Sequence, residues 1–155
     1  MLEALVFSDS LLESRNTLEL VKSLKSLRTK LAAINQDNVD KSSLGQIRQD
    51  LIAPRLMQHK DKGVRVLVAC CASDLLRLYA PDPPFDQTQL KHLFALFFKQ
   101  LHGIGDSTGV YFSDYYYLLD SICTVRSVTL LADLNADQLV IDLVRDMLDI
   151  ITYAN

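Results

Sequence analysis

Apolar residues recur along most of this chain at the three- and four-residue spacing of one helical face. In the first such segment the stripe consists of Leu20, Leu24, Leu27, Leu31 and Ile34. The pattern predicts a helix that begins at Thr17 and stops in the polar run 35–40, because asparagine and aspartate side chains compete with helical backbone hydrogen bonds. Residues 1–16 lack the pattern and are expected to form a short or irregular N-terminal segment.

Two more helices are predicted before residue 80. Ser42 or Ser43 can cap the first of them, which reaches Ile52 and is interrupted by Pro54. Asp61 is expected to cap the second. The apolar residues of this second helix cover most of its circumference and include Val64, Val66, Leu67, Val68, Cys71, Leu75, Leu76 and Leu78. A helix that is apolar on so many sides is buried between neighbouring helices.

The helical pattern continues through the second half of the chain. Asp86 and Gln89 have the spacing of a capping box at the start of a helix that reaches Leu101. Gly103 and Gly105 are expected to end that helix. Later helices are expected over residues 111–125, 127–134 and 136–151, the last capped by Asn135.

These elements predict an all-α fold in which antiparallel helix pairs form a HEAT-repeat-like α-solenoid fragment. No period-two alternation persists, and the short connections are typical of antiparallel neighbours. Asp61, Val64 and Arg65 match the Asp-x-x-Val-Arg pattern that often opens the second helix of a HEAT repeat. In that pattern the aspartate caps, the valine enters the core and the arginine reaches a neighbouring repeat's cap. Residues 17–155 are therefore predicted to form one helical-repeat domain, with a four-helix bundle as the alternative.

Composition agrees with a folded intracellular domain that does not enter a membrane. Of the 155 residues, 49% are hydrophobic and 23% are charged, and the formal net charge of −3 lacks the positive footprint of a dedicated DNA clamp. The apolar runs are too short for a membrane span, and the first seven residues are too short for a secretory signal. The odd set Cys70, Cys71 and Cys123 indicates a reducing compartment, where such cysteines act as small core residues.

The sequence carries no pattern that predicts an enzyme, a cofactor or a metal site. The Gly-x-Gly at 103–105 follows a helix instead of a strand, so it lacks the context of a dinucleotide-binding loop. The three histidines lack metal-ligand spacing, and His92 and His102 are expected on solvated helix faces. Of the tyrosines at 115–117, at least one should be in the core and one on the surface, and core packing is favoured over a nucleic-acid stacking platform.

A proline-rich corner is the most informative segment for binding. It consists of Ala80, Pro81, Asp82, Pro83, Pro84 and Phe85. Three prolines fix φ and hold the residues before them extended, so the segment is a stiff turn between two helices that loses little entropy on binding. Its carbonyl groups and the Asp82 carboxylate could receive a short peptide. The alternative is purely structural, since Phe85 and Leu90 also have the spacing of a hydrophobic staple.

A row of cations on the first predicted helix raises the separate possibility of DNA contact. The row consists of Lys22, Lys25, Arg28 and Lys30. Such a row could touch phosphates, but a solvated helix face is the favoured interpretation. Salt-dependent binding to DNA would distinguish the two.

Several short stretches of this sequence, in the same order, resemble the N-terminal region of a known family. They are the stretches 56–65, 69–71 and 74–82, with Leu24-Lys25-Ser26-Leu27, the loop 37–40 and the run 130–134. The family is that of the cohesin-associated cohesion factors named for precocious dissociation of sisters, in its fungal branch. The resemblance spans roughly residues 17 to 150, and it implies that the chain is the N-terminal part of a longer, hook-shaped HEAT-repeat protein.

The resemblance also implies a function, partners and a place in the cell. Family members regulate cohesin on chromatin in the nucleus and maintain or release sister-chromatid cohesion. They bind the kleisin subunit of cohesin, through contacts spread along the repeats, and they act with the wings-apart-like releasing factor, a cohesin acetyltransferase and, in animals, sororin. Two alternatives remain open: a structural repeat segment whose binding surface lies downstream, or a chromatin module with weak DNA contact.

The resemblance implies a docking role for the proline-rich corner. In the family this segment is Ala-Pro-Asp-Ala-Pro-Tyr, and it docks short motifs of the releasing factor and its antagonists. Ala80, Pro81, Asp82 and Pro84 match it, whereas Pro83 replaces alanine and Phe85 replaces tyrosine. The corner is therefore predicted to present the Asp82 carboxylate and the Phe85 ring to a basic and an aromatic residue of a disordered partner.

Overall fold

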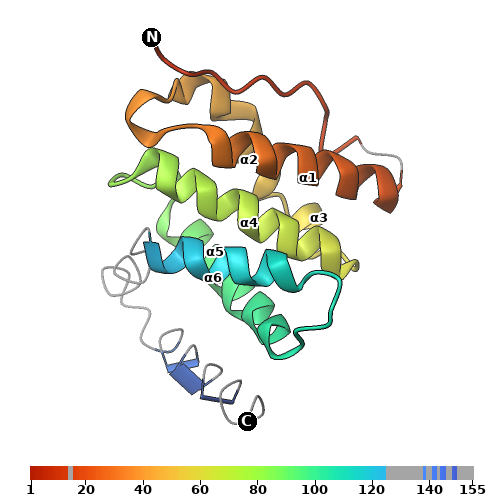
Figure 1. Cartoon of the computed structure of the whole chain (residues 1–155). Coiled ribbons are helices and arrows are strands. Elements are labelled where there is room, and N and C mark those ends of the chain that lie inside the picture. The colour runs from red at the N-terminus through yellow and green to blue at the C-terminus, as the bar shows by residue number, and fades with distance from the viewer. Residues whose placement is uncertain (14–15, 125–137, 139–140, 143, 146–147, 150–155) are drawn as a thin grey trace.

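The computed structural model describes residues 1–13, 16–124, 138, 141–142, 144–145 and 148–149 (Figure 1). The α-helices are α1 (Thr17–Ala33), α2 (Gly45–Leu51), α3 (Pro54–Met57), α4 (Lys62–Tyr79), α5 (Gln87–Leu101) and α6 (Phe112–Thr124). Three 3-10 turns join them: η1 (Gln36–Asn38), η2 (Lys41–Leu44) and η3 (His102–Gly105). The helix predicted over 127–134 and most of the one over 136–151 lie outside the described residues.

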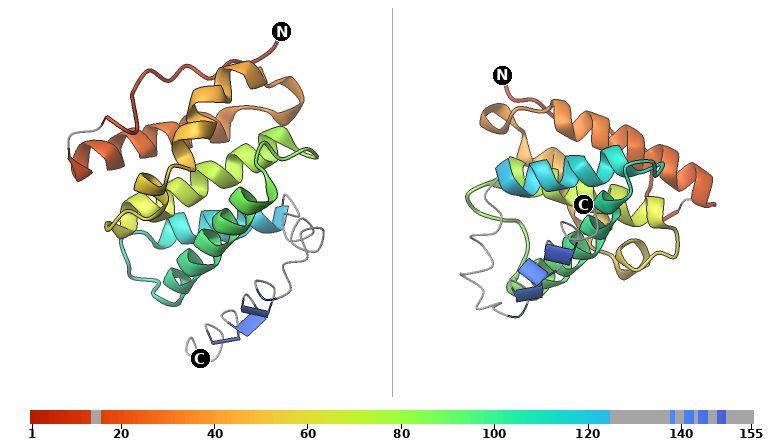
Figure 2. Two further views of the ribbon diagram at one scale, coloured as in Figure 1. Left: turned by 180° about the vertical axis from the view of Figure 1, so that it is seen from behind. Right: turned by 60° about the horizontal axis from the view of Figure 1, so that its bottom comes forward.

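The helices lie in two layers, with α4 in the middle of the first (Figures 1 and 2). Helices α1, α4 and α6 lie side by side and run in the same direction, whereas α5 runs back behind them. Helix α4 contacts α1, α6, α5, α3 and α2. This arrangement of stacked helix pairs is that of an α-solenoid, and it excludes the alternative four-helix bundle for the described residues.

Helix α1 begins and ends where the sequence predicted. The Asn16 side chain accepts a hydrogen bond from the Glu19 backbone N–H at 2.9 Å and caps the first turn. The whole predicted apolar stripe from Leu20 to Ile34 is buried. Ile34 is extended, with φ −81° and ψ 133°, and the polar run that follows forms η1.

The caps around α2 differ from the prediction. Asp40, and neither Ser42 nor Ser43, caps the turn η2, because its carboxylate accepts from the Ser42 backbone N–H at 3.1 Å. Helix α2 then continues from η2 without a side-chain cap of its own. Pro54 interrupts the chain as predicted, and it is the first residue of the short helix α3, where its missing N–H costs no hydrogen bond.

Helix α4 is buried on nearly every side, as its apolar circumference predicted. Every residue of α4 is buried except Lys62, Arg65, Arg77 and Tyr79. Asp61 caps the helix by accepting from the Val64 backbone N–H at 3.0 Å.

Arg65 of α4 departs from its predicted role. Arg65 donates to the carbonyls of His59 at 2.7 Å and Lys60 at 2.9 Å, in the turn before its own helix, and does not reach a neighbouring repeat's cap. Arg77 makes the contact between helices instead. Its Nη1 and Nη2 donate to the carbonyls of Ile34 at 3.0 Å and Leu31 at 2.9 Å, at the C-terminal end of α1, where the Leu31 carbonyl also accepts from the Ile34 backbone N–H.

Helix α5 begins with the predicted capping box, and the glycines after it lie in the turn η3. Asp86 and Gln89 exchange side-chain to backbone hydrogen bonds of 2.8 and 2.9 Å. No described glycine has positive φ, so the glycines after α5 do not end it through a left-handed cap. Gly103 is required for another reason: a Cβ at this position would lie 2.2 Å from the ring of Tyr115.

The N-terminal segment is irregular, as predicted, yet it is attached to the helices. Glu3 forms an isolated parallel bridge with Val39, and the Leu5 backbone N–H donates to the Ser43 hydroxyl at 2.9 Å. Leu11 is only 2% exposed and belongs to the core. In the described parts of the chain, no helix is long and apolar enough to cross a membrane.

The cysteines follow the prediction at two of three positions. Cys70 and Cys71 are buried in α4, where burial raises the pKa of each thiol. Cys123 is exposed near the end of α6, so the expectation that all three act as core residues is wrong for this one.

Candidate functional site

The proline-rich corner joins the C-terminal end of α4 to the start of α5 and is held by hydrogen bonds at its first residues. The Ala80 backbone N–H donates to the Arg77 carbonyl at 3.4 Å, and the Asp82 N–H donates to the Tyr79 carbonyl at 3.0 Å. Gln36 of η1 donates from Nε2 to the Ala80 carbonyl at 3.3 Å. The corner is therefore attached to both the helix before it and the turn after α1.

The tip of the corner faces water. Pro81 and Asp82 are exposed, while Ala80, Pro83 and Pro84 are half-buried. No described residue pairs with the Asp82 carboxylate, since its only hydrogen bond is made by its backbone. A rigid turn with an unpaired carboxylate at its tip can receive a cation or a hydrogen-bond donor from a partner.

The expected role of Phe85 is wrong in one respect: its ring is not presented to solvent. Phe85 is 7% exposed and Leu90 is 4% exposed, and both belong to the hydrophobic core. They lie on either side of the Asp86 cap, which is the arrangement of a hydrophobic staple. Because the ring packs in the core, it helps to fix where the chain enters α5. It is therefore not free to form a docking surface.

Tyr79 supplies an aromatic side chain beside the corner that sequence reasoning missed. It is half-buried at the last position of α4, and its hydroxyl donates to the Lys41 carbonyl at 3.2 Å. The Lys41 ammonium lies 5.6 Å from the centre of its ring. The only sequence feature that could have linked Tyr79 to the corner is its position directly before Ala80. That feature is weak, because an aromatic residue at the end of a helix often packs in a core.

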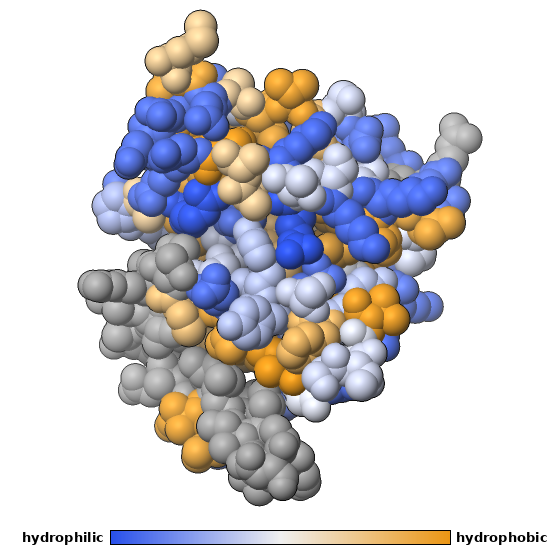
Figure 3. Space-filling model, viewed as in Figure 1, coloured by the Kyte–Doolittle hydropathy of each residue, from blue (hydrophilic) through white to orange (hydrophobic). Residues whose placement is uncertain are grey.

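The predicted DNA-contact row on α1 is divided by the fold. Arg28 forms an ion pair with Asp114 of α6 at 2.5 Å and lies 4.4 Å above the ring of Tyr117. Lys30 donates from Nζ to the Val6 carbonyl at 2.8 Å. Lys22 and Lys25 are exposed. Figure 3, viewed as Figure 1, shows that hydrophilic side chains cover much of the upper half of the molecule, where α1 lies. Tertiary partners therefore engage Arg28 and Lys30, and the possibility of DNA contact by the row stays untested.

A buried polar cluster ties α4 to α6 behind the corner. The Tyr117 hydroxyl lies 2.8 and 3.0 Å from the two Asp74 carboxylate oxygens, and Arg77 Nε lies 3.4 Å from Asp74. Asp74 is 1% exposed, and burial raises the pKa of its carboxyl. Burial and the neighbouring carboxylate likewise raise the pKa of Tyr117. Tyr116 is exposed, as predicted for one member of the tyrosine run, whereas Tyr115 and Tyr117 are half-buried and pack against the core without being fully buried.

Among the residues that the structure describes, no three His, Cys, Asp or Glu side chains cluster to hold a metal ion. His92 and His102 are exposed, as expected. The corner is the best-defined candidate site that the sequence indicated.

Comparison with known families decides where this chain belongs. The family model for "Sister chromatid cohesion protein PDS5 protein" matches residues 18–155. The chain belongs to the PDS5 family. The resemblance recognised in the sequence is thereby confirmed.

PDS5 proteins from distant organisms align with most of the chain. The chain is 42% identical to the PDS5 protein of Saccharomyces cerevisiae over 129 residues, which are 83% of the chain and 10% of that protein. It is 36% identical to the pds5 protein of Schizosaccharomyces pombe over 135 residues, which are 86% of the chain and 11% of that protein. It is 31% identical to PDS5 homolog A of Homo sapiens over 140 residues, which are 88% of the chain and 10% of that protein. The chain spans about a tenth of the length of these curated relatives.

A solved PDS5 structure confirms the fold. It is a Pds5–Scc1 complex studied for its implications for cohesin function. The described fold superposes on it with a TM-score of 0.86 at 38% identity, covering 91% of this chain and 22% of that one. The predicted HEAT-repeat α-solenoid is thus the fold that this family adopts here.

Proposed function

We propose that this chain is the N-terminal protein-binding module of a cohesin regulator that acts on sister-chromatid cohesion in the nucleus, on chromatin, without catalysing a reaction. Membership of the PDS5 family supports the part concerning cohesion. The similar Pds5–Scc1 complex supports binding to the kleisin subunit. The family resemblance implies that such contacts are spread along the repeats. The observation that carries the docking role is the exposed, unpaired carboxylate of Asp82 on an anchored proline turn.

The occupant of the corner is a short disordered segment of a cohesin regulator. The wings-apart-like releasing factor and the cohesin acetyltransferase are the candidates from the family resemblance. A basic residue of the segment pairs with Asp82, and an aromatic residue packs on the exposed ring of Pro81 beside Tyr79. The stiffness of the turn keeps the entropic cost of docking low, whereas the exposure of the carboxylate keeps the affinity moderate. Competing regulators can then exchange at one site.

Reversal of charge at Asp82 tests the proposal. A labelled peptide from the wings-apart-like factor is titrated with wild type, with Asp82→Lys and with Glu19→Lys, and anisotropy is recorded. Glu19 is an exposed carboxylate in the first turn of α1, the end of that helix away from the contact with Arg77, so its variant changes the net charge equally at the other end of the layer. We expect Asp82→Lys to weaken binding about tenfold or more and Glu19→Lys to leave it unchanged. Equal affinity for wild type and Asp82→Lys would refute the docking role.

DNA contact by α1 is not part of the proposal, because only Lys22 and Lys25 of the four cations remain available. Two phosphate contacts would give a salt dependence with a slope of only about −2 in a plot of log K against log salt concentration. A much steeper slope in DNA binding by this chain would indicate that more of its cations contact phosphates.

A further inference from the structure

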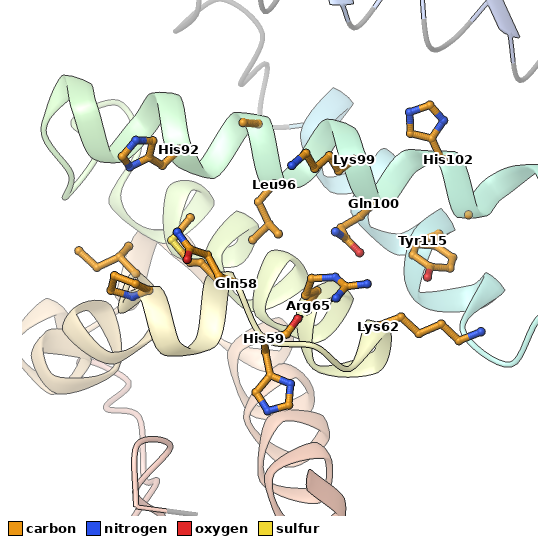
Figure 4. Close-up of a pocket in the computed structure, with 15 residues that line it drawn as sticks. Gln58, His59, Lys62, Arg65, His92, Leu96, Lys99, Gln100, His102 and Tyr115 are labelled. Carbon is orange, nitrogen blue, oxygen red and sulfur yellow. Dashed lines mark hydrogen bonds between the residues drawn. The ribbon is translucent and has the colours of Figure 1, made fainter.

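A basic groove lies at the opposite end of α4 from the proline corner (Figure 4). Its walls are α3 with the turn after it, the first turns of α4, and the second half of α5 with Tyr115 of α6. The cavity measures about 870 Å³, which is the size of a binding site for a peptide segment or a small molecule.

The charged side chains that line the groove are all cationic. They are Lys62 and Arg65 of α4 and Lys99 of α5, and no described carboxylate lines the cavity. None of the three forms an ion pair with a described residue. The Arg65 guanidinium is also held in place, since its Nη1 donates to two carbonyls of the preceding turn. A chain with a net charge of −3 thus keeps an unneutralised positive groove.

Two carboxylates adjoin Lys62 and are engaged elsewhere. Asp61 accepts from the Val64 backbone N–H as the cap of α4. Asp106 accepts from the hydroxyl and backbone N–H of Thr108 at 2.7 and 3.1 Å, and these bonds, with a contribution from Lys62, lower the pKa of its carboxyl. Neither carboxylate lines the groove, so the field inside it stays positive.

Gln100 is the second, independent sign of a ligand. Its side chain projects from α5 toward Arg65 and Tyr115 in Figure 4. The residue is only 6% exposed and lines the cavity, yet its amide has no hydrogen bond to any residue that the structure describes. A buried amide without partners is costly and uncommon. Because an amide both donates and accepts, its natural complement is the N–H and C=O of a peptide backbone.

The groove also has an apolar wall. Leu96 of α5 points into it in Figure 4, and Ile52 and Met57 line the same side. An inorganic anion or a phosphate backbone would leave this wall unused. A peptide that carries an apolar side chain would bury it there, with acidic neighbours against the cations.

We propose that the groove between α3, α4 and α5 binds an extended acidic peptide segment of a partner protein, with Gln100 bonded to its backbone, an apolar residue on Leu96 and acidic residues at Arg65 and Lys99. This site is separate from the proline corner. Arg65 and Ala80 are about 22 Å apart along the axis of α4 at 1.5 Å per residue. The proposal therefore does not depend on the docking role of Asp82.

The test uses the 155-residue chain and one defined probe. The probe is a short fluorescein-labelled peptide with a central leucine-phenylalanine pair flanked on both sides by glutamates. Its affinity is measured by anisotropy, and its place is mapped by nitrogen-15 NMR, in which the side-chain NH₂ of Gln100 has its own signal. Matched probes replace the apolar pair by serines or the glutamates by lysines. Inorganic phosphate and a thymidine oligonucleotide serve as competitors.

Variants make the test specific. We expect Lys99→Glu to weaken binding of the acidic peptide about tenfold, whereas Lys91→Glu, on the exposed face of the same helix and outside the groove, leaves it unchanged. We expect Gln100→Leu to raise the thermal midpoint of unfolding while it weakens peptide binding severalfold, because the substitution removes an unsatisfied amide from the free chain. Asp82→Lys should leave binding of this peptide unchanged.

Four results would overturn the proposal. One is an unchanged Gln100 signal on addition of the acidic peptide. Another is an equal loss of affinity in Lys91→Glu and Lys99→Glu, which would indicate unspecific attraction. The third is an oligonucleotide or phosphate that displaces the peptide as effectively as the unlabelled peptide does, since that would assign the groove to phosphates. The fourth is a serine probe that binds as tightly as the acidic peptide, since that would show that the apolar wall takes no part in binding.

Discussion

Replacement of Arg77 by methionine tests how the two helices beside the proline corner are joined. Arg77 lies one turn before the end of α4, and its guanidinium donates to the carbonyls of Leu31 and Ile34 at the end of α1. Methionine keeps much of the apolar stem but cannot donate. The substitution therefore removes two hydrogen bonds, of which the one to Ile34 has no protein donor to replace it, whereas the Leu31 carbonyl still accepts from the Ile34 backbone N–H at 3.2 Å. It also leaves Asp74 without its neighbouring cation.

The magnitude follows from the contacts. A hydrogen bond to a charged group contributes about 1.5–3 kcal/mol, and the lower figure applies here because the Arg77 side chain is 24% exposed and water competes. The two bonds to α1 then amount to about 3 kcal/mol. The Asp74 contact, with Nε at 3.4 Å, is too long to add a full hydrogen bond. Loss of the guanidinium still leaves the Asp74 carboxyl, which is 1% exposed, in a less favourable field at neutral pH.

The assay is urea unfolding at neutral pH, followed by far-ultraviolet circular dichroism. We expect Arg77→Met to lose about 3 kcal/mol of unfolding free energy, and to lose less in an Asp74→Asn background, where no buried carboxylate is stranded. Arg48→Met is the matched control, because Arg48 is a half-buried helical arginine whose side chain forms no hydrogen bond to a described residue. If the two arginine variants lose equal stability, the reasoning about Arg77 is refuted.

Three further predictions concern packing, protonation and thiol access. Gly103→Ala should lose about 1–2 kcal/mol of stability in urea unfolding, because its Cβ would lie 2.2 Å from the Tyr115 ring, whereas Gly45→Ala, with no atom within 4 Å, should be neutral or gain; equal effects would contradict this. Burial raises the pKa of Asp74 above the ordinary 3.8, so its contribution to stability is fully present below that pH and is lost as pH rises toward the folded pKa. Asp74→Asn should therefore gain stability relative to wild type as pH rises from about 3.5 to 7, and a relative loss would disprove the sign. A thiol reagent should label Cys123 rapidly in the folded chain and the two buried cysteines only after unfolding; fast labelling of all three would refute their burial.

Local sequence determined the helices because their signals act within a few residues. The Asp61 cap, the Asp86–Gln89 capping box and the break at Pro54 each depend on groups within four residues in the chain. The burial of α4 could also be predicted, because a helix with apolar residues on every side must pack against other elements on every side.

The proline corner shows where such reasoning reaches its limit. The sequence predicted a stiff exposed turn, and Pro81 and Asp82 are exposed. It left two roles open for Phe85, and only the packing of α5 against α4 decided that the ring enters the core. A phenylalanine in a hydrophobic staple and one in a docking surface have the same local sequence pattern. They differ in whether the core or solvent lies next to the ring, and only tertiary packing decides this.

The charged residues were decided almost wholly by tertiary structure. Arg28 has the sequence surroundings of a solvated helix face, yet it meets Asp114, 86 residues further along. Lys99 and Gln100 become part of a binding groove only because α5 packs beside Arg65 of α4. Hydrophobic periodicity records which face of a helix avoids water, so the sequence alone determines helices and core. It does not record which distant helix supplies the partner of a charge, because that contact exists only once the layers have packed.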